Sequence, residues 1–163
     1  MNEGELNSEF EGLLRSNRGR LNAIARAYAG SEADDLFQDI CLQLWRSVKS
    51  FRGKSNIDTW CYRVALNTAI SWQRKTSRRN TELALVPADI NEVQGTSHGE
   101  DSVRLLERFM QTLSAPDRAV LLMYLDDLSG AEMAEVTGMK ENSLRVRIHR
   151  IKLRLADWNA GDA

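Results

Sequence analysis

Basic side chains are concentrated near the end of the chain, and the residue types there suit sequence-specific contacts with a nucleic acid. Six bases stand against one acid between Lys140 and Arg154, although the whole chain has a formal charge of −1. In the DNA major groove, arginine bonds guanine edges, asparagine bonds adenine edges, and an apolar side chain touches a thymine methyl. The segment therefore offers chemistry for sequence recognition.

A helical register sorts this segment into a buried side and an exposed side. At about 100° per residue, the apolar stripe that we expect to be buried consists of Leu144, Ile148, Ile151 and Leu155. The opposite face then carries Asn142, Val146, His149 and Arg150, with Arg145 and Arg147 on its flanks. Ser143 and the flanking arginines suit phosphates, which position a protein on DNA without specifying sequence.

The element before this helix favours a helix-turn-helix. Ser129 and Glu132 form a capping-box pattern in front of a short helix, in which Met133 and Val136 can pack inward. Gly138 suits the turn because glycine adopts a positive φ at little cost. A surface helix can be basic for other reasons, but a capped helix and a glycine turn ahead of it favour DNA recognition.

A second basic segment mixes aromatic and cationic residues. The aromatic residues are Trp60, Tyr62 and Trp72, and the cations are Lys54, Arg63, Arg74, Lys75, Arg78 and Arg79. Aromatic rings stack on unpaired bases while cations hold the backbone, as in proteins that bind single strands or melted duplex. Burial of the tryptophans in the core is the alternative, and it partly applies to Trp60 and Trp72.

The stretch DDLFQDICLQLWRSV predicts another amphipathic helix. Its expected buried stripe is Phe37, Ile40, Cys41, Leu44 and Val48. The opposite face consists of Asp35, Gln38, Asp39, Leu42 and Arg46. A leucine within an otherwise polar face indicates a protein partner, although singly exposed leucines are common and a merely solvated face remains open.

Nothing in the sequence indicates an enzyme or a bound cofactor. The two cysteines and two histidines show no metal-ligand spacing, and there is no glycine-rich phosphate loop and no GxSxG. We therefore expect no catalytic residue, no metal and no cofactor. No apolar run approaches the roughly 20 residues that cross a bilayer, and the acidic start is unlike a signal peptide, so we expect a cytoplasmic protein.

Helical periodicity predicts an all-α fold of two small helical domains joined by a flexible acidic linker. The expected parts are residues 1–80, a linker at 81–102, and a helix-turn-helix domain at 103–163. Expected helix signals include Gly30 as a C-cap, Ser31 with Asp34 as a capping box, Thr59 as a cap, and Ser114 with Asp117 as a cap ahead of Pro116. One amphipathic helix is expected from Val103, Leu106, Phe109, Met110 and Leu113.

Taken together, the chain resembles the sigma-70-type RNA polymerase sigma factors of the small extracytoplasmic-function (ECF) subgroup. The resemblance rests on three blocks in order, which cover nearly all residues except the ends and the linker: DDLFQDICLQLW, FRGKSNIDTWCYRVALNTAISWQRK and LSAPDRAVLLMYLDDLSGAEMAEVTGMKENSLRVRIHRIKLRL. The order of the blocks makes it specific, since a helix-turn-helix alone also occurs in many regulators.

The resemblance implies contacts with core RNA polymerase and promoter DNA. The first block would dock on the clamp coiled coil of the large subunit through Asp35, Gln38, Asp39, Leu42 and Arg46, and the flap would be a further contact. The second block would capture the melted minus-ten element, with a base flipped into the loop Lys54, Ser55, Asn56, Ile57 and Asp58. Asn67, Trp72, Arg74 and Lys75 would lie along duplex or non-template strand, and the last block would read the minus-thirty-five element.

Several positions depart from the usual family pattern. Ile57-Asp58 stands where an aromatic and then a basic residue are common, which affects the base pocket. Lys140-Glu141-Asn142 replaces a frequent Pro-Glu-Gly turn, and Val146 replaces a common serine. These changes lie on the outward face, so we expect them to alter promoter choice more than the fold.

The sequence thus predicts a promoter-specificity subunit for transcription initiation. The alternatives are a stand-alone helix-turn-helix regulator and a sigma-like adaptor that sequesters a protein partner. Two roles are open for the acidic linker, which would either thread a basic channel of the polymerase or mask the basic helices in the free protein. The resemblance also allows an anti-sigma factor as a partner.

Overall fold

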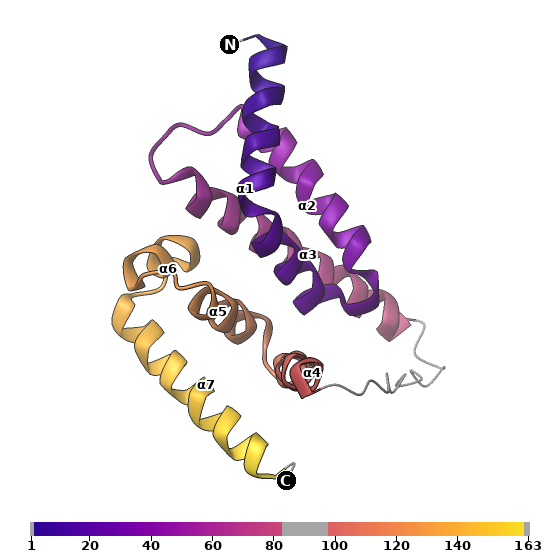
Figure 1. Ribbon diagram of the computed structural model, residues 1–163, viewed down its shortest axis with the longest axis vertical. Helices are drawn as coiled ribbons and strands as arrows, with labels where there is room; N and C mark the ends of the chain where they lie inside the picture. Colours follow the sequence, from indigo (N-terminus) through magenta and orange to yellow (C-terminus); the bar gives the residue numbers. More distant parts are fainter. Residues whose placement is uncertain (1, 83–97, 162–163) are drawn as a thin grey trace.

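The computed structural model describes residues 2–82 and 98–161, and within these ranges it contains helices and no strand. Figure 1 shows α1, α2 and α3 in one group and α4 to α7 in another. The elements are α1 (Glu3–Ala29), the 3-10 turn η1 (Gly30–Glu32), α2 (Ala33–Val48), α3 (Ile57–Glu82), α4 (His98–Gln111), α5 (Ala115–Leu125), α6 (Gly130–Thr137) and α7 (Glu141–Gly161). The expected all-α class is confirmed.

The N-terminal domain is a three-helix assembly around an apolar core. Each of α1, α2 and α3 packs against the other two. Its most deeply buried large side chains are Leu21, Ile24, Leu36, Ile40, Leu44 and Tyr62. Removing this apolar surface from water is the main stabilising contribution, at about 25 cal/mol per Å².

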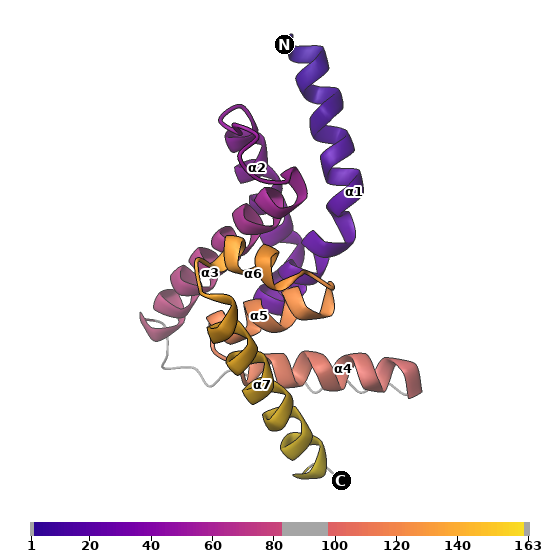
Figure 2. The ribbon, with the colours of Figure 1, turned by 90° about the vertical axis from the view of Figure 1, so that its left-hand side faces the viewer.

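The C-terminal domain buries one face of its last long helix against α5 and α6. Its core contains Phe109, Val120, Met123, Met133, Leu144 and Ile151. Figure 2 shows α7 running away from the first domain, with α5 and α6 lying between α7 and that domain. The core residues of the two domains belong to one continuous cluster, so the domains pack together.

Most expected helix ends are confirmed, each by a hydrogen bond at the helix terminus. Gly30 ends α1 with a positive φ of 55°, and its N–H donates to the Arg26 carbonyl. The Ser114 hydroxyl accepts the Asp117 N–H at the start of α5. These contacts satisfy backbone groups that helix termini otherwise leave without partners.

Two predicted caps are wrong. Ser31 does not open α2, because Gly30–Glu32 forms a 3-10 turn and α2 begins at Ala33 without a side-chain cap. Thr59 does not cap α3, since it is buried inside the first turn. The cap is Asn56, whose side-chain oxygen accepts the Asp58 N–H at 2.8 Å.

The predicted amphipathic helix at the start of the second domain is only partly correct. Phe109, Met110 and Leu113 are buried, as expected, but Val103 is 58% exposed. The helix also begins earlier than expected, at His98, while α3 continues to Glu82. The middle of the predicted linker, 83–97, lies outside the described residues, and so do its expected path and the acids Asp89 and Glu92.

Candidate promoter and polymerase interface

The helix-turn-helix is built by local hydrogen bonds around α6. The Ser129 hydroxyl accepts the Glu132 N–H at 3.1 Å, and the Glu132 carboxylate accepts the Ser129 N–H at 2.7 Å, which confirms the capping box. Gly138 ends α6 in the left-handed region with φ 74°. The Thr137 hydroxyl then accepts the Met139 N–H at 3.1 Å, which fixes the turn into α7.

The exposed face of α7 carries the side chains predicted to read DNA. Leu144 and Ile151 are buried, and Ile148 and Leu155 are half-buried beside them, as the helical register predicted. Val146 is 51% exposed on the opposite side. The other exposed members of the predicted set are Asn142, Ser143, Arg145, His149 and Arg150. Asn142, Ser143, Val146 and Arg150 also line one open hollow beside the turn.

Arg147 differs from its neighbours on α7. Its Nη1 donates to Asp117 Oδ1 at 2.6 Å, and its side chain is only partly exposed. This contact joins α7 to the first turn of α5. The pair holds the Arg147 guanidinium against α5, and Arg147 also lines the open hollow beside the turn with Asn142 and Arg150.

The outer face of α2 is exposed as the sequence predicted. Ile40 and Leu44 are fully buried, while Phe37, Cys41 and Val48 are half-buried at the edge of the stripe. Leu36, which the predicted stripe omitted, is also fully buried. Leu42 is 45% exposed in the middle of a face formed with Asp35, Gln38, Asp39 and Arg46, all of which are exposed. These five residues are called the α2 face below.

The predicted minus-ten residues divide between an exposed stripe and the core. On an α-helix of 3.6 residues per turn, Arg63, Asn67, Arg74 and Arg78 share one side of α3, and all four are exposed. Trp72 is half-buried on the other side of the helix, which separates it from that stripe. Lys75 and Arg79 are exposed on a flank.

Tyr62 is not available for base stacking. It is 1% exposed, and its hydroxyl is the one buried side-chain polar atom without a hydrogen-bond partner among the described residues. Burial and the nearby Asp126 carboxylate hold the pKa of Tyr62 well above its usual value. The expected aromatic set is therefore reduced to Trp60 and Trp72, and the half-buried Trp60 packs on the Phe51 ring at 5.2 Å.

The loop before α3 is anchored from α1. Asn17 is buried, and its Nδ2 donates to Asp58 Oδ1 at 2.8 Å and to the Leu13 carbonyl at 3.0 Å. Lys54 and Asn56 are exposed, and Ser55 and Asp58 are half-buried. Sequence reasoning missed Asn17, because a polar residue in a helix gives no signal of a partner 41 positions away.

Metal-ligand clusters, membrane spans and the two cysteines were compared over the described parts of the chain. No group of three or more His, Cys, Asp or Glu side chains within 2–82 and 98–161 is placed to hold a metal ion. Over the same ranges no helix is long and apolar enough to span a membrane. Burial, with Asp58 nearby, raises the pKa of the Cys61 thiol to about 12, which leaves it an unreactive core group.

A helix-turn-helix with a polar recognition face, beside a separate helical domain with a basic stripe, defines a two-domain transcription protein that binds DNA. Family comparison agrees with this class. Residues 13–79 match the model for Sigma-70 region 2, and residues 104–155 match the model for Sigma-70, region 4. The chain belongs to the sigma-70 family of RNA polymerase sigma factors, in the ECF subgroup.

Individual relatives and a solved structure agree with this family. RNA polymerase sigma factor YlaC of Bacillus subtilis is 29% identical over 130 residues, which cover 76% of this chain and 75% of that protein. ECF sigma factor SigM of Mycobacterium tuberculosis is 25% identical over 150 residues, 90% of this chain and 75% of the relative. The fold matches that of the sigma factor RpoE from Bartonella quintana, solved with the anti-sigma factor NepR, with a TM-score of 0.75 at 22% identity over 98% of this chain and 99% of that one.

Proposed function

We propose that this sigma factor divides promoter recognition among three surfaces of its own chain. The α2 face binds the clamp coiled coil of core RNA polymerase. The loop 54–58 and the exposed stripe of α3 hold the opened minus-ten element. The outer face of α7 reads the minus-thirty-five element, and the polymerase flap supports the C-terminal domain.

The observation that carries the proposal is the outer face of α7. It offers Asn142, Val146 and Arg150 together, and a capped α6 and the Gly138 turn hold it away from the core. Arginine and asparagine bond base edges bidentately, while an apolar group meets a thymine methyl. An exposed face with this composition has no packing role inside the domain.

In this proposal the chain selects the promoter and orients the polymerase on it, and it does not itself catalyse a reaction. In the proposal the polymerase joins nucleotides, and the sigma factor acts with it in the cytoplasm without a cofactor. Each DNA surface alone gives weak binding with steep salt dependence, since phosphate contacts release counterions. Tethering both surfaces to one polymerase raises their effective concentration at the promoter.

The α2 face supports a role that needs the polymerase. Leu42 is exposed among two carboxylates, an amide and a guanidinium, so binding would cover an apolar group at the centre of a polar rim. Interfaces commonly combine a small apolar centre with such a rim. A stand-alone regulator would have no use for this surface, and an adaptor that sequesters a partner would have no use for the α7 face.

Transcription in vitro with purified core polymerase and a randomised promoter library tests the proposal. We expect the protein to direct initiation at promoters that share two separated elements, and we expect no specific DNA binding without polymerase. A protein that binds one operator tightly by itself would instead be a stand-alone regulator. A polymerase that initiates no differently in the presence of the protein would contradict the proposal.

A further inference from the structure

The greater part of α1 carries positive charge and no acid. Between Leu13 and Ser31 the sequence has four arginines and no aspartate or glutamate, in a chain whose formal charge is −1. Four acids instead occupy the first eleven residues of the chain. The helix is therefore divided into an acidic end and a basic part, and none of the three surfaces proposed above uses the basic part.

Three of the four arginines share one exposed side of α1. At about 100° per residue, Arg15, Arg18 and Arg26 fall together with Asn22 within an arc of about 80°. The three arginines are exposed, and Asn22 is half-buried. The fourth arginine, Arg20, is half-buried on a different side, where it borders a small hollow. The residues Arg15, Arg18, Asn22 and Arg26 are called the α1 stripe below.

The surface around the α1 stripe is open. The helix turns its other side inward, where Leu21 and Ile24 are fully buried in the core. Gly12 and Gly19 lie beside the stripe on the exposed side. A Cβ added at either glycine would meet nothing within 4 Å. An extended polymer thus has room to approach the arginines along the helix.

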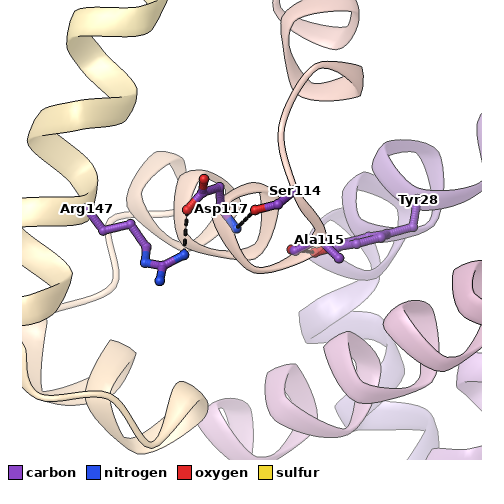
Figure 3. Close-up of polar contacts among 5 residues, drawn as sticks. All are labelled: Tyr28, Ser114, Ala115, Asp117 and Arg147. Atoms are coloured by element: carbon purple, nitrogen blue, oxygen red, sulfur yellow. Dashed lines mark hydrogen bonds and ion pairs between the residues drawn. The ribbon is translucent and has the colours of Figure 1, made fainter.

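The second domain meets α1 at its last turn. The Tyr28 hydroxyl donates to the Ala115 carbonyl at 2.7 Å, as Figure 3 shows at the first turn of α5. The Ala27 carbonyl accepts from Arg118 Nη1 at 2.9 Å. These contacts involve the end of the helix, and they leave Arg15 and Arg18 exposed.

Helix stability does not account for the α1 stripe. A cation near a helix C-terminus interacts favourably with the helix dipole, but this effect falls off within the last turn. Arg26 lies in the last turn, whereas Arg15 and Arg18 lie about four and three turns before the end. Within 2–82 and 98–161, none of the three guanidinium groups forms an ion pair with an acidic side chain. Their charge is therefore available to a partner.

The composition of the α1 stripe favours phosphate groups over a protein surface. Among the described residues, no large hydrophobic side chain is exposed on α1, whereas the α2 face has Leu42 at its centre. Protein interfaces commonly have an apolar or aromatic centre. Contacts to DNA phosphates are made by arginine and amide side chains and need no such centre.

The length of the α1 stripe matches a short run of phosphates. A rise of 1.5 Å per residue places Arg15 and Arg26 about 16 Å apart along the helix axis. One strand of duplex DNA has a phosphate about every 3.4 Å, so about five phosphates fit along the stripe. The acidic first part of α1 repels the same backbone, which restricts the strand to the basic part.

The α1 stripe begins beside the loop proposed for the minus-ten element. Asn17 lies between Arg15 and Arg18 in the sequence, and its Nδ2 donates to Asp58 Oδ1 of the loop at 2.8 Å. The other end of α3 leads toward the second domain, which is proposed to read the upstream element. DNA that leaves the loop on the side away from the second domain therefore continues downstream, toward α1.

We propose that the α1 stripe binds the phosphate backbone of promoter DNA immediately downstream of the minus-ten element. This is a fourth DNA or polymerase contact of the chain, and its placement rests on the role proposed above for the loop and α3. The stripe adds affinity and salt dependence without sequence preference, because phosphates carry no sequence information directly.

The salt dependence of promoter binding by the holoenzyme tests the contact. We replace Arg15, Arg18 and Arg26 together by glutamine. The slope of log K against log salt should become less steep by about 0.9 for each lost contact on duplex and about 0.7 on a single strand. Replacing the same three arginines by lysine is the matched control, because it keeps each charge and should keep the slope. Equal slopes for the glutamine variant and the parent would overturn the proposal.

Three promoter DNAs identify the stretch that is bound. The first ends at the minus-ten element, the second continues downstream as duplex, and the third continues as a single strand. We expect the glutamine variant to lose affinity only for DNA that continues downstream, and the affected form shows whether the stripe binds duplex or single strand. An equal loss on all three DNAs would overturn the downstream placement.

Cleavage of the DNA backbone gives a second reading that does not depend on affinity. A DNA-cleaving iron chelate is attached at Ser16→Cys, an exposed position of α1, in a Cys41→Ser background. Cys61 is fully buried and stays unlabelled. We expect cuts downstream of the minus-ten element in the holoenzyme complex. Cuts confined to other positions would contradict the placement.

Affinity for core polymerase without DNA decides the class of partner. The glutamine variant should bind core polymerase as tightly as the parent does. A loss there would assign the α1 stripe to an acidic protein surface and overturn the DNA contact. Failure of the roles proposed for α3 and α7 is distinguishable, because it would appear as a lack of sequence preference in the parent holoenzyme, whereas counterion release by the α1 stripe needs no particular sequence.

Discussion

Arg147 and Asp117 join α7 to the first turn of α5. The bond from Arg147 Nη1 to Asp117 Oδ1 is 2.6 Å, and Asp117 also donates its N–H to the Ser114 hydroxyl (Figure 3). One acidic residue thus completes the N-terminal turn of α5 and sets the position of α7. Arg147 is half-buried by this contact, whereas Arg145 and Arg150 are exposed.

Replacing Asp117 with alanine should weaken binding to the minus-thirty-five element without removing any group that touches DNA. The pair is partly exposed, so we expect a coupling of only about 0.2–1 kcal/mol in a double-mutant cycle with Arg147→Ala. In the Asp117→Ala background, Arg147→Ala should then have little further effect. Fluorescence anisotropy measures the affinity of the holoenzyme for upstream-element DNA. The cycle compares the parent, the two single variants and the double variant.

Arg145→Ala is the control for this cycle. Arg145 is exposed on the flank of α7, and a phosphate contact there would lower the salt dependence of binding by about one charge. The loss should be the same with or without Asp117. Arg147→Ala would instead reveal a phosphate contact if it lowered the salt dependence of DNA binding equally in the parent and in Asp117→Ala.

Arg150→Ala should cost about 1–3 kcal/mol at the upstream element and relax the preference at one base position. The side chain is exposed on the recognition face and lines the hollow with Val146 and Asn142. Selection from a randomised upstream element by the holoenzyme measures both effects. Lys152→Ala is the matched control, because Lys152 lies 4.4 Å from the Tyr124 ring centroid and off that face. Uniform weakening across all sequences would make Arg150 a phosphate contact.

Leu42→Arg should strongly weaken polymerase binding while leaving the fold intact. Leu42 is 45% exposed at the centre of the α2 face, so a long charged side chain has room in the free protein but would disrupt an apolar interface centre. We expect at least a tenfold loss in affinity for core polymerase and an unchanged melting temperature. Gln43→Arg, at an exposed neighbouring position, is the control. Equal affinities of both variants would place the polymerase contact elsewhere.

Stability should fall as the pH rises above 9, with Cys61 as one cause. Burial raises the pKa of Cys61 from 9.0 to about 12, and burial also raises the pKa of Tyr28 above its usual value. An acid with a raised native pKa contributes stability that is complete below its unfolded pKa and is lost as the pH rises toward the native value. Each such group lowers the free energy of unfolding by about 1.4 kcal/mol per pH unit in its window.

Urea unfolding of Cys61→Ala measures this contribution. The variant should be less stable at pH 7 because a buried sulfur is lost, but its stability should decline less steeply than that of the parent between pH 9 and pH 10. Cys41→Ala is the comparison: burial also raises the pKa of the half-buried Cys41 thiol, so its pH curve should flatten in the same direction. Parallel pH curves for the parent and Cys61→Ala would show that the thiol does not ionise on unfolding in this window.

Surfaces formed by a single helix could be predicted from the sequence. The exposed positions of Leu42 and Val146 follow from 3.6 residues per turn, since each helix must turn its apolar stripe inward. The same reasoning placed Leu144 and Ile151 in the core. The helix-turn-helix was equally accessible, because Ser129, Glu132 and Gly138 act over a few residues.

Contacts between distant segments could not be predicted in the same way. Periodicity placed no partner opposite Arg118, although an arginine within the apolar run APDRAVLLMYL was a visible irregularity. The Tyr28 hydroxyl likewise finds its acceptor in α5, 87 positions away. Ser31 shows the opposite error, because the local capping pattern was present but Gly30–Glu32 forms a 3-10 turn between the packed helices α1 and α2.

Asn17 offers the last test, because its amide connects the core of α1 to the loop proposed for the minus-ten element. Its Nδ2 donates to Asp58 Oδ1 at 2.8 Å from a buried position. Asn17→Leu removes the bond at similar size and should cost about 1–2 kcal/mol. Asn17→Asp should cost more at pH 7, because it places a second carboxylate against Asp58 in a partly desolvated site.

The difference in the free energy of unfolding between Asn17→Asp and Asn17→Leu should become smaller as the pH falls. Below the usual aspartate pKa of about 3.9, protonation removes the repulsion, so the stability of Asn17→Asp should approach that of Asn17→Leu. Urea unfolding at pH 7 and near pH 3.5 measures this, with Asn7→Asp on the exposed surface of α1 as the control. Equal stabilities of Asn17→Asp and Asn17→Leu at pH 7 would contradict a close Asn17–Asp58 pair. If the pair holds the loop for a flipped base, Asn17→Leu should also weaken binding of forked minus-ten DNA by the holoenzyme, while upstream-element affinity stays unchanged.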